Sequence, residues 1–251
     1  MMTEIRNFIE ICGEMVILFF ETVKASFILK NRYGLIFKNI ITMGIRTLPI
    51  AMIMSFFVGM VLSLQSGYQL NKFGLNDILG AIVFLSLLKE LAPVQTAVLM
   101  LAKVGTSITA EIGSMRVSEE IETLNIMGIN IINYLIMPRF IACIFSTIIL
   151  VIYADIIGLI GGAIVANYYF GLSYSKFFDS AFQYVNTIDL VGNLLKAFLF
   201  GILIANISSY FGLNVKLSSE GIGEATTNTV VVSFIVLLIC NYFVTKLLLY
   251  L

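Results

Sequence analysis

The stretch TLPIAMIMSFFVGMVLSLQSGYQL, residues 47–70, contains no charged side chain. It is long enough to cross a bilayer as one helix, which takes about 20 apolar residues. Small side chains recur in it at every fourth position and therefore share one face: Ala51, Ser55, Gly59, Ser63 and Gly67. Such a face lets another helix approach closely, so it predicts a packing surface, either within the chain or between two copies.

Apolar blocks of this kind continue down the chain. Of the 251 residues, 59% are hydrophobic and 12% are charged, whereas soluble domains carry about 25% charged residues. We therefore predict an all-α integral membrane protein with about five transmembrane helices, at residues 47–70, 78–103, 135–167, 190–212 and 227–250.

The region before the first span alternates charged and apolar residues. Residues 4–30 predict an amphipathic helix that lies in the membrane interface, with a weak first span as the alternative. We expect residues 1–46 to form an N-terminal cytoplasmic and interfacial region. Residues 47–251 are expected to form the transmembrane domain, with a cytoplasmic coupling segment at 104–134.

Basic residues indicate the orientation of the chain. Lysine and arginine concentrate before the first span and between the second and third spans, and cytoplasmic loops are enriched in these residues. The N-terminus is therefore predicted to be cytoplasmic. With an odd number of crossings, the C-terminus is predicted to be periplasmic.

Two adjacent charges interrupt the second span, in LLKELAPVQTAVLM (87–100). At mid-membrane depth each of Lys89 and Glu90 costs about 2.5–3.5 kcal/mol, so each needs a partner or water. Pro93 lacks the N–H that would bond the carbonyl of Lys89, and it is expected to kink this helix. Lys196 is the predicted partner of Glu90, and Asp155 is a second candidate. These groups predict a polar translocation path, or alternatively a buried salt bridge that holds helices in register.

The segment between the second and third spans carries the next concentration of charge. From Glu119 to Met127 apolar residues share one helical face, and Gly128 is a natural stop. A short acidic helix of this kind is a candidate docking element. The alternative is a solvated loop helix.

Several classes of function are excluded by what the sequence lacks. It contains no histidine, its three cysteines are scattered, and no paired catalytic carboxylates are evident. We therefore expect no catalytic residue, no metal and no cofactor. The net charge of zero argues against a nucleic-acid partner. The phosphate-binding pattern G-x-x-x-x-G-K-[ST] does not occur, so any ATP must be bound by a separate chain.

One long segment resembles a known family. SLLKELAPVQTAVLMLAKVGTSITAEIGSMRVSEEIETLNIMGI (86–129) is similar to the signature of the MlaE (YrbE-type) family of lipid-transporting ABC permeases, as are GMVLSLQ (59–65), DLVGNLLKAF (189–198) and SSEGIGEATTNTVV (218–231). The resemblance covers about residues 40–240. Lys89 and Lys103 stand where the family usually has arginine, which keeps the charge and loses the planar fork.

The resemblance implies a non-catalytic permease subunit of the inner membrane that moves phospholipid between inner and outer membranes. Its implied partners are an ABC ATPase, an MCE-domain lipid-binding protein, a second permease copy and, as a further candidate, a small STAS-domain accessory protein. It places Lys89, Glu90 and Lys196 at the substrate, and Glu111, Arg116 and Glu119 at the ATPase. The alternative function is an ion-coupled secondary transporter that uses intramembrane carboxylates.

Overall fold

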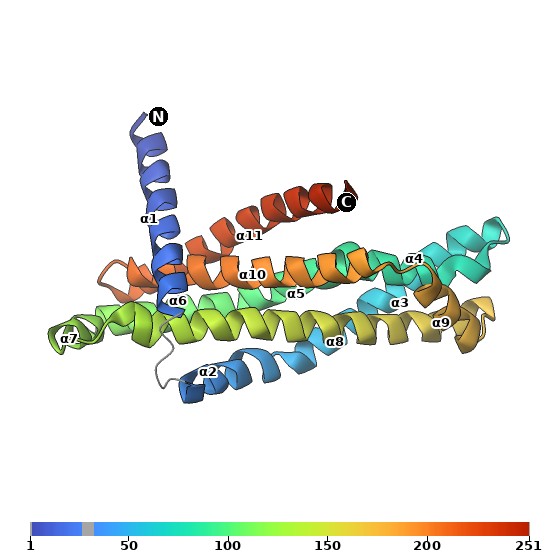
Figure 1. The fold of residues 1–251 in the computed structure, drawn as a ribbon, viewed down its shortest axis with the longest axis horizontal. Helices are drawn as coiled ribbons and strands as arrows, with labels where there is room; N and C mark the ends of the chain where they lie inside the picture. Colours follow the sequence, from blue (N-terminus) through green and yellow to red (C-terminus); the bar gives the residue numbers. More distant parts are fainter. Residues whose placement is uncertain (1, 27–32, 251) are drawn as a thin grey trace.

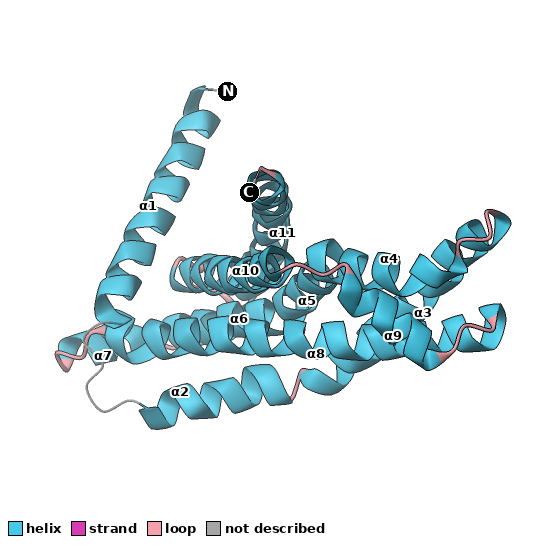
Figure 2. Cartoon of the chain, turned by 45° about the vertical axis from the view of Figure 1, so that its right-hand side comes forward, coloured by secondary structure: helices cyan, strands magenta, loops and turns pink. Residues whose placement is uncertain are grey.

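The computed structural model describes residues 2–26 and 33–250, and these residues form helices and short connections only. Figures 1 and 2 show an elongated bundle. The α-helices are α1 (Met2–Ser26), α2 (Tyr33–Ile40), α3 (Leu48–Lys72), α4 (Leu79–Ser86), α5 (Ala92–Met100), α6 (Thr106–Val117), α7 (Glu120–Ile126), α8 (Met137–Phe170), α9 (Tyr174–Gln183), α10 (Thr187–Leu213) and α11 (Ser219–Leu249). Short π-helical segments join some of them: η1 (Ile41–Ile45), η3 (Leu87–Leu91), η4 (Leu101–Gly105) and η5 (Ile132–Ile136); η2 (Asn76–Ile78) is a 3₁₀ turn.

Among the residues that the structure describes, four helical stretches are long and apolar enough to cross a membrane: Tyr33–Lys72, Ile132–Phe170, Thr187–Leu213 and Ser219–Leu249. They contain the predicted first, third and fourth spans, and the fifth, 227–250, except for its last residue. The predicted all-α membrane fold is confirmed. The last helix begins earlier than predicted because Ser218 caps its N-terminus by accepting a hydrogen bond from the backbone N–H of Gly221.

The predicted second span, 78–103, is not among these four stretches. Its residues form one continuous helical run through α4, η3, α5, η4 and α6. This run contacts α3, α8, α10 and α11, and many of its side chains, such as Leu87 and Met100, are fully buried. The segment that carries Lys89 and Glu90 therefore lies inside the bundle.

The run ends later than the predicted second span, which stops at residue 103, whereas the helix continues to Val117. The coupling segment at 104–134 stays a prediction, and its first part is helical. Gly105 and Gly113 do not end it, because both are positions of close packing. A Cβ on Gly105 would meet Ser208 at 3.0 Å, and one on Gly113 would meet Val215 at 2.8 Å.

The small residues of α3 form the packing surface that the sequence predicts, and it lies within the chain. The buried residues of α3 are Ala51, Ser55, Gly59, Ser63 and Gly67, and they face α8. Glycines 158, 161 and 162 of α8 face them in turn. The two backbones approach so closely that a Cβ on Gly59 would overlap the carbonyl of Gly158. This contact fixes the relative position of α3 and α8.

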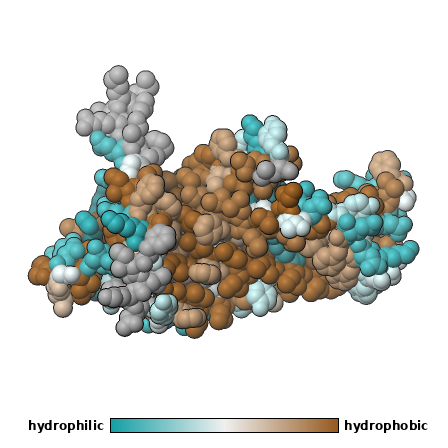
Figure 3. Space-filling view, viewed as in Figure 1, coloured by the Kyte–Doolittle hydropathy of each residue, from teal (hydrophilic) through white to brown (hydrophobic). Residues whose placement is uncertain are grey.

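The surface of the molecule fits a membrane. Figure 3 shows apolar residues over the central length of the bundle and polar residues gathered towards its two ends. Large apolar side chains on α3, α8, α10 and α11 are exposed, among them Phe57 (59% exposed) and Ile239 (53% exposed). An apolar surface of this extent indicates contact with lipid or with another subunit.

The two ends of the bundle differ. Figure 1 shows α1 lying across the long axis at the end that also holds α7, while α9 lies at the opposite end. Helix α1 packs on that end through Leu18, and its Glu14 accepts a hydrogen bond from Tyr210 at 2.7 Å. The predicted interfacial helix at 4–30 thus corresponds to α1, and the part of the prediction at 27–30 lies outside the described residues. Helix α2, which follows, was not predicted.

Candidate functional site

The π-helical segment η3 (Leu87–Leu91) shapes the centre of the candidate site. Such segments disturb the regular hydrogen bonds of a helix and are frequent at functional sites. Pro93, at the start of α5, cannot donate to the carbonyl of Lys89. That carbonyl instead accepts a hydrogen bond from Nζ of Lys196 on α10. The Lys89 carbonyl, which Pro93 leaves without its helical donor, therefore accepts a hydrogen bond from the Lys196 ammonium of α10.

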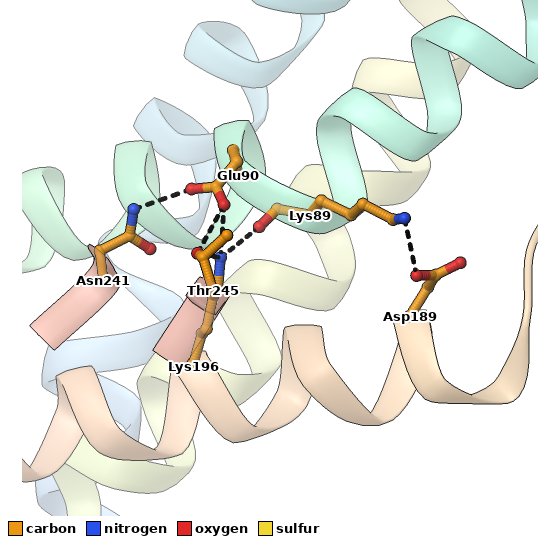
Figure 4. Close-up of polar contacts among 6 residues, drawn as sticks. All are labelled: Lys89, Glu90, Asp189, Lys196, Asn241 and Thr245. Atoms are coloured by element: carbon orange, nitrogen blue, oxygen red, sulfur yellow. Dashed lines mark hydrogen bonds and ion pairs between the residues drawn. The ribbon is translucent and has the colours of Figure 1, made fainter. Parts of the chain in front are cut away.

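Glu90 joins three helices through its carboxylate (Figure 4). Its Oε1 accepts from Nζ of Lys196 at 2.8 Å and from the hydroxyl of Thr245 at 2.7 Å, and its Oε2 accepts from the amide of Asn241 at 2.8 Å. Thr245 and Asn241 belong to α11. Lys196 is only 2% exposed, whereas the Glu90 side chain is 39% exposed. A buried ammonium is thus held against a carboxylate that reaches the surface of a cavity.

Lys89 points the other way along the helix, towards the beginning of α10 (Figure 4). Its Nζ lies 3.1 Å from Oδ1 of Asp189, and its side chain is 48% exposed. Asp189 is held by a capping box, in which the Asn186 backbone N–H donates to the Asp189 carboxylate. The two neighbouring charges therefore have different partners, as expected from their separation of about 100° around the helix.

A cavity of about 150 Å³ opens between η3, α10 and the end of α11. Its lining includes Lys89, Glu90 and Lys196 together with Asp189 and Thr245, and apolar residues such as Leu248 complete it. Since one water occupies about 30 Å³, the cavity can hold several waters or a group the size of a phosphate. It is too small for a whole phospholipid, whose chains would have to lie outside it.

Asp155 does not join this cluster. Its Oδ2 accepts a hydrogen bond from the amide of Asn193, a residue that also lines the cavity. Both side chains are buried, and Oδ1 of each has no hydrogen-bond partner among the described residues. Of the two partners predicted for Glu90, the structure brings Lys196 to it and places Asp155 elsewhere.

The predicted coupling residues lie on α6 and just after it. Glu111 pairs with Arg139 at 3.0 Å and accepts from Ser107 at 2.9 Å. Arg116 is partly buried, and its Nε makes no hydrogen bond with the described residues. Glu119 precedes α7. The backbone N–H of Glu119 donates to the carbonyl of Arg116 at 3.1 Å, but no side-chain hydrogen bond or ion pair joins Glu111, Arg116 and Glu119 within residues 2–26 and 33–250.

Helix α7 matches the short helix that the sequence predicts in the connector. It ends in a Schellman motif, in which Gly128 has φ 74° and the N–H of Ile129 bonds the carbonyl of Leu124. Ile121 is 2% exposed, but Met127, expected on the same apolar face, is 69% exposed. The apolar face of α7 is therefore buried at Ile121 and exposed at Met127, where a partner could pack against it.

Glu119 has φ 57°, and no other described residue except glycine has a positive φ. We expect Glu119→Gly to stabilise the start of α7 by about 0.5–1 kcal/mol, because glycine adopts this backbone conformation without the Cβ penalty. Hydrogen exchange of the α7 amides should then slow about 2–5-fold. Glu120→Gly is the matched control: Glu120 is helical, so exchange should accelerate there. Faster exchange in Glu119→Gly would contradict the assigned strain.

Sequence reasoning missed Asp189, Asn241 and Thr245. The sequence does indicate a structural role for Asp189, because Asn186 and Asp189 have the spacing of a capping box at the start of the fourth span. Asn241 and Thr245 are one helical turn apart in α11 and face the same carboxylate. Two polar residues at this spacing in an apolar helix weakly indicate a shared polar contact. Only the fold shows that their common partner is Glu90.

Removing the ammonium of Lys89 tests its ion pair with Asp189, in which the Lys89 side chain is 48% exposed and the Asp189 side chain 12% exposed. We expect Lys89→Met to lower the free energy of unfolding by less than about 1 kcal/mol, because ion pairs with a solvent-exposed member contribute little and Asp189 keeps its hydrogen bond from the Asn186 N–H. Thermal unfolding in detergent measures this effect. Asp77→Asn, which breaks the exposed pair with Lys176 (3.8 Å), is the control and should be equally mild. A loss of several kcal/mol would mean that Lys89 holds the helices together.

Fold and site together define a class of protein. An all-helical membrane bundle with charged groups at a cavity between its helices is typical of a membrane transport protein. The sequence matches the family described as Permease MlaE over residues 36–247. The chain belongs to the MlaE permease family.

Individual relatives agree with this assignment. The chain is 39% identical over 215 residues to a "Probable ABC transporter permease protein" of Rickettsia bellii, covering 86% of this chain and 83% of the relative. It is 34% identical to the "Intermembrane phospholipid transport system permease protein MlaE" of Haemophilus influenzae, covering 95% and 96%. It is also 32% identical to the chloroplastic protein TRIGALACTOSYLDIACYLGLYCEROL 1 of Arabidopsis thaliana, covering 79% of this chain and 57% of that protein.

Proposed function

We propose that this chain is the permease subunit of an ABC transporter that moves phospholipid or a related polar lipid between two membranes. The observation that carries the proposal is the cavity beside η3, which is lined by both the partly exposed ammonium of Lys89 and the partly exposed carboxylate of Glu90 inside an apolar bundle. A phospholipid head group carries a phosphate and often an amine, which Lys89 and Glu90 complement. The name of the Haemophilus influenzae relative supports the same class of cargo.

In this proposal Lys89 contacts the phosphate and Glu90 contacts the amine, while Lys196 keeps the Glu90 carboxylate in place. Lys196 is buried and bonded to η3 and α11 together. Movement of α11 would therefore alter the position and the charge environment of Glu90. The apolar surfaces of α10 and α11 beside the cavity would carry the acyl chains.

The power source in this proposal is a separate ATPase that docks on the connector around α7. Glu111, Arg116 and Glu119 are the proposed coupling residues. The exposed apolar side chains of Ile126 and Met127 support a docking surface there. Since α6 runs without a break into the helix that carries Glu90, displacement at α7 has a direct route to the cavity.

The remaining parts of the proposal concern assembly and topology. The chain works in the inner membrane as a homodimer, with the end that holds α1 and α7 in the cytoplasm and the C-terminus periplasmic. An MCE-domain protein and a small STAS-domain protein are the further partners. The basic residues near α2 and α6 support this orientation, and the family resemblance supports the partners.

Reconstitution tests the energy source. The chain and its ATPase are placed in donor vesicles with fluorescent phospholipid, and lipid transfer to an acceptor is followed. We expect transfer to require ATP hydrolysis and to continue after an ionophore removes the membrane potential. The control is the same complex with the phosphate-loop lysine of the ATPase replaced. Transfer that needs no ATPase and stops with the ionophore would favour the ion-coupled alternative, with Glu90 and Asp155 as ion sites.

A further inference from the structure

A second and larger cavity lies near the α7 end of the bundle, away from the site around Glu90. Its volume is about 570 Å³, within the range of about 300–1,000 Å³ typical of small-molecule sites. It is lined by α2 and η1 on one side and by η4, α6, η5 and the beginning of α8 on the other, and it is open to the surface. Its charged lining consists of four cations and one carboxylate: Lys38, Arg46, Lys103, Arg139 and Glu111.

The single carboxylate does not neutralise this lining. Glu111 pairs with Nη2 of Arg139 at 3.0 Å. The other terminal nitrogen of Arg139, Nη1, is buried and has no hydrogen-bond partner among the described residues. Nζ of Lys103 donates to a neutral acceptor, the carbonyl of Arg46, at 2.6 Å. The cavity lining therefore carries an excess of positive charge.

Apolar groups accompany this charge. The cavity is also lined by Leu35, Met43, Leu135 and Pro138. On the outer side of the same wall, Phe37, Ile41 and Ile45 of α2 and η1 are 64%, 51% and 58% exposed. A ligand with an anionic group inside and apolar chains against this outer surface would satisfy both features, whereas a small soluble anion would satisfy only the first.

We propose that this cavity binds the phosphate head group of an anionic membrane lipid that is a resident ligand and not the transported cargo. Lys103 binds the phosphate within the cavity, the Arg139 guanidinium adds its positive charge, and Lys38 and Arg46 neutralise the phosphate charge at the rim. Basic pockets between membrane helices on the cytoplasmic side bind such head groups. The lipid joins α2 to α6, the helix that leads to α7, so it stabilises the connector. This inference does not depend on the identity of the cargo.

Native mass spectrometry of the full chain in detergent tests the proposal. The chain is titrated with dioleoyl phosphatidylglycerol, which is anionic, and with dioleoyl phosphatidylcholine, which is not. We expect tighter binding of phosphatidylglycerol. The exposed double variant Lys38→Gln/Arg46→Gln should weaken it about 30-fold, because each cation near a lipid surface contributes a factor of about five. Lys72→Gln/Lys176→Gln, which removes two exposed charges at the opposite end, should bind like the unmodified chain.

A third variant separates this cavity from the proposed cargo site. Lys89→Met should retain the preference for phosphatidylglycerol. The proposal is overturned if Lys38→Gln/Arg46→Gln binds phosphatidylglycerol normally, or if Lys89→Met alone removes the preference. Thermal unfolding of the chain with lipid or with inorganic phosphate is a second measurement. The proposal is also overturned if inorganic phosphate at the same concentration raises the melting temperature of the chain as much as phosphatidylglycerol does, since the ligand would then be a soluble anion. None of these results would alter the proposed transport of phospholipid.

Discussion

Glu90→Lys is expected to abolish lipid transport while the protein still inserts into the membrane. The substitution removes the carboxylate that accepts hydrogen bonds from Lys196, Thr245 and Asn241, and it introduces a second ammonium beside a lysine that is 2% exposed. Loss of one partner of a fully buried ion pair costs about 3–5 kcal/mol. Because Glu90 is 39% exposed, that value is an upper bound for the lost pairing, to which repulsion between the two ammonium groups is added. The measurement is ATP-dependent transfer of fluorescent phospholipid, with insertion checked by resistance to carbonate extraction.

Two further variants make this result specific. Glu90→Gln keeps an acceptor for Lys196 and a similar shape, so it should insert normally and retain more transport than Glu90→Lys. The exchange Glu90→Lys/Lys196→Glu restores opposite charges across the helices and should recover part of the lost stability. If Glu90→Lys alone transported lipid at the normal rate, the charged cavity could not be the transport path.

Gly59→Ala is expected to be among the most destabilising single-methyl additions in the chain. The new Cβ would overlap the backbone carbonyl of Gly158 on α8, and a backbone atom cannot move aside as a side chain can. Overpacking typically costs about 1–3 kcal/mol, and we expect about 3 kcal/mol here because α3 and α8 must separate along their length. Thermal unfolding and the monodisperse fraction in size-exclusion chromatography measure the effect.

Gly34→Ala is the matched control for this prediction. Apart from its chain neighbours and the backbone of its own helix, no atom of the described residues lies within 4 Å of a Cβ built on Gly34 in α2. Alanine is favoured over glycine in a helix by about 0.5–1 kcal/mol, so this variant should be neutral or slightly stabilising. Equal melting temperatures for Gly59→Ala and Gly34→Ala would contradict the close contact between α3 and α8.

The parts of the fold that follow from local sequence pattern could be predicted. Long, predominantly apolar segments predict α3, α8, α10 and α11, and the four-residue spacing of small side chains predicts the buried face of α3. The π-helical segments could not be predicted, because each depends on hydrogen bonds that shift by one residue under tertiary packing. Helix α9 was missed because it is only ten residues long and buries Phe177 against α4, a contact that local pattern does not reveal.

The site divides in the same way. Lys89, Glu90 and Lys196 are conspicuous because charge is rare in apolar helices. Which of these residues pair depends on the tertiary structure, so the sequence left both Lys196 and Asp155 as candidate partners of Glu90. The contribution of α11 needed the fold, since Thr245 lies 155 residues from Glu90 in the chain. The second cavity likewise combines α2, α6 and α8, which no continuous stretch of sequence brings together.

The contacts of Lys196 limit how it can take part in recognition. An ammonium group has three hydrogens to donate, and in this structure they are shared among the Lys89 carbonyl, the Glu90 carboxylate and the Thr245 hydroxyl. A phosphate can gain a hydrogen bond from Lys196 only by displacing one of these acceptors. Binding of a head group to Lys196 would then also weaken the contact between η3, α10 and α11. Without a ligand that displaces one of the three acceptors, these helices would stay joined through Lys196.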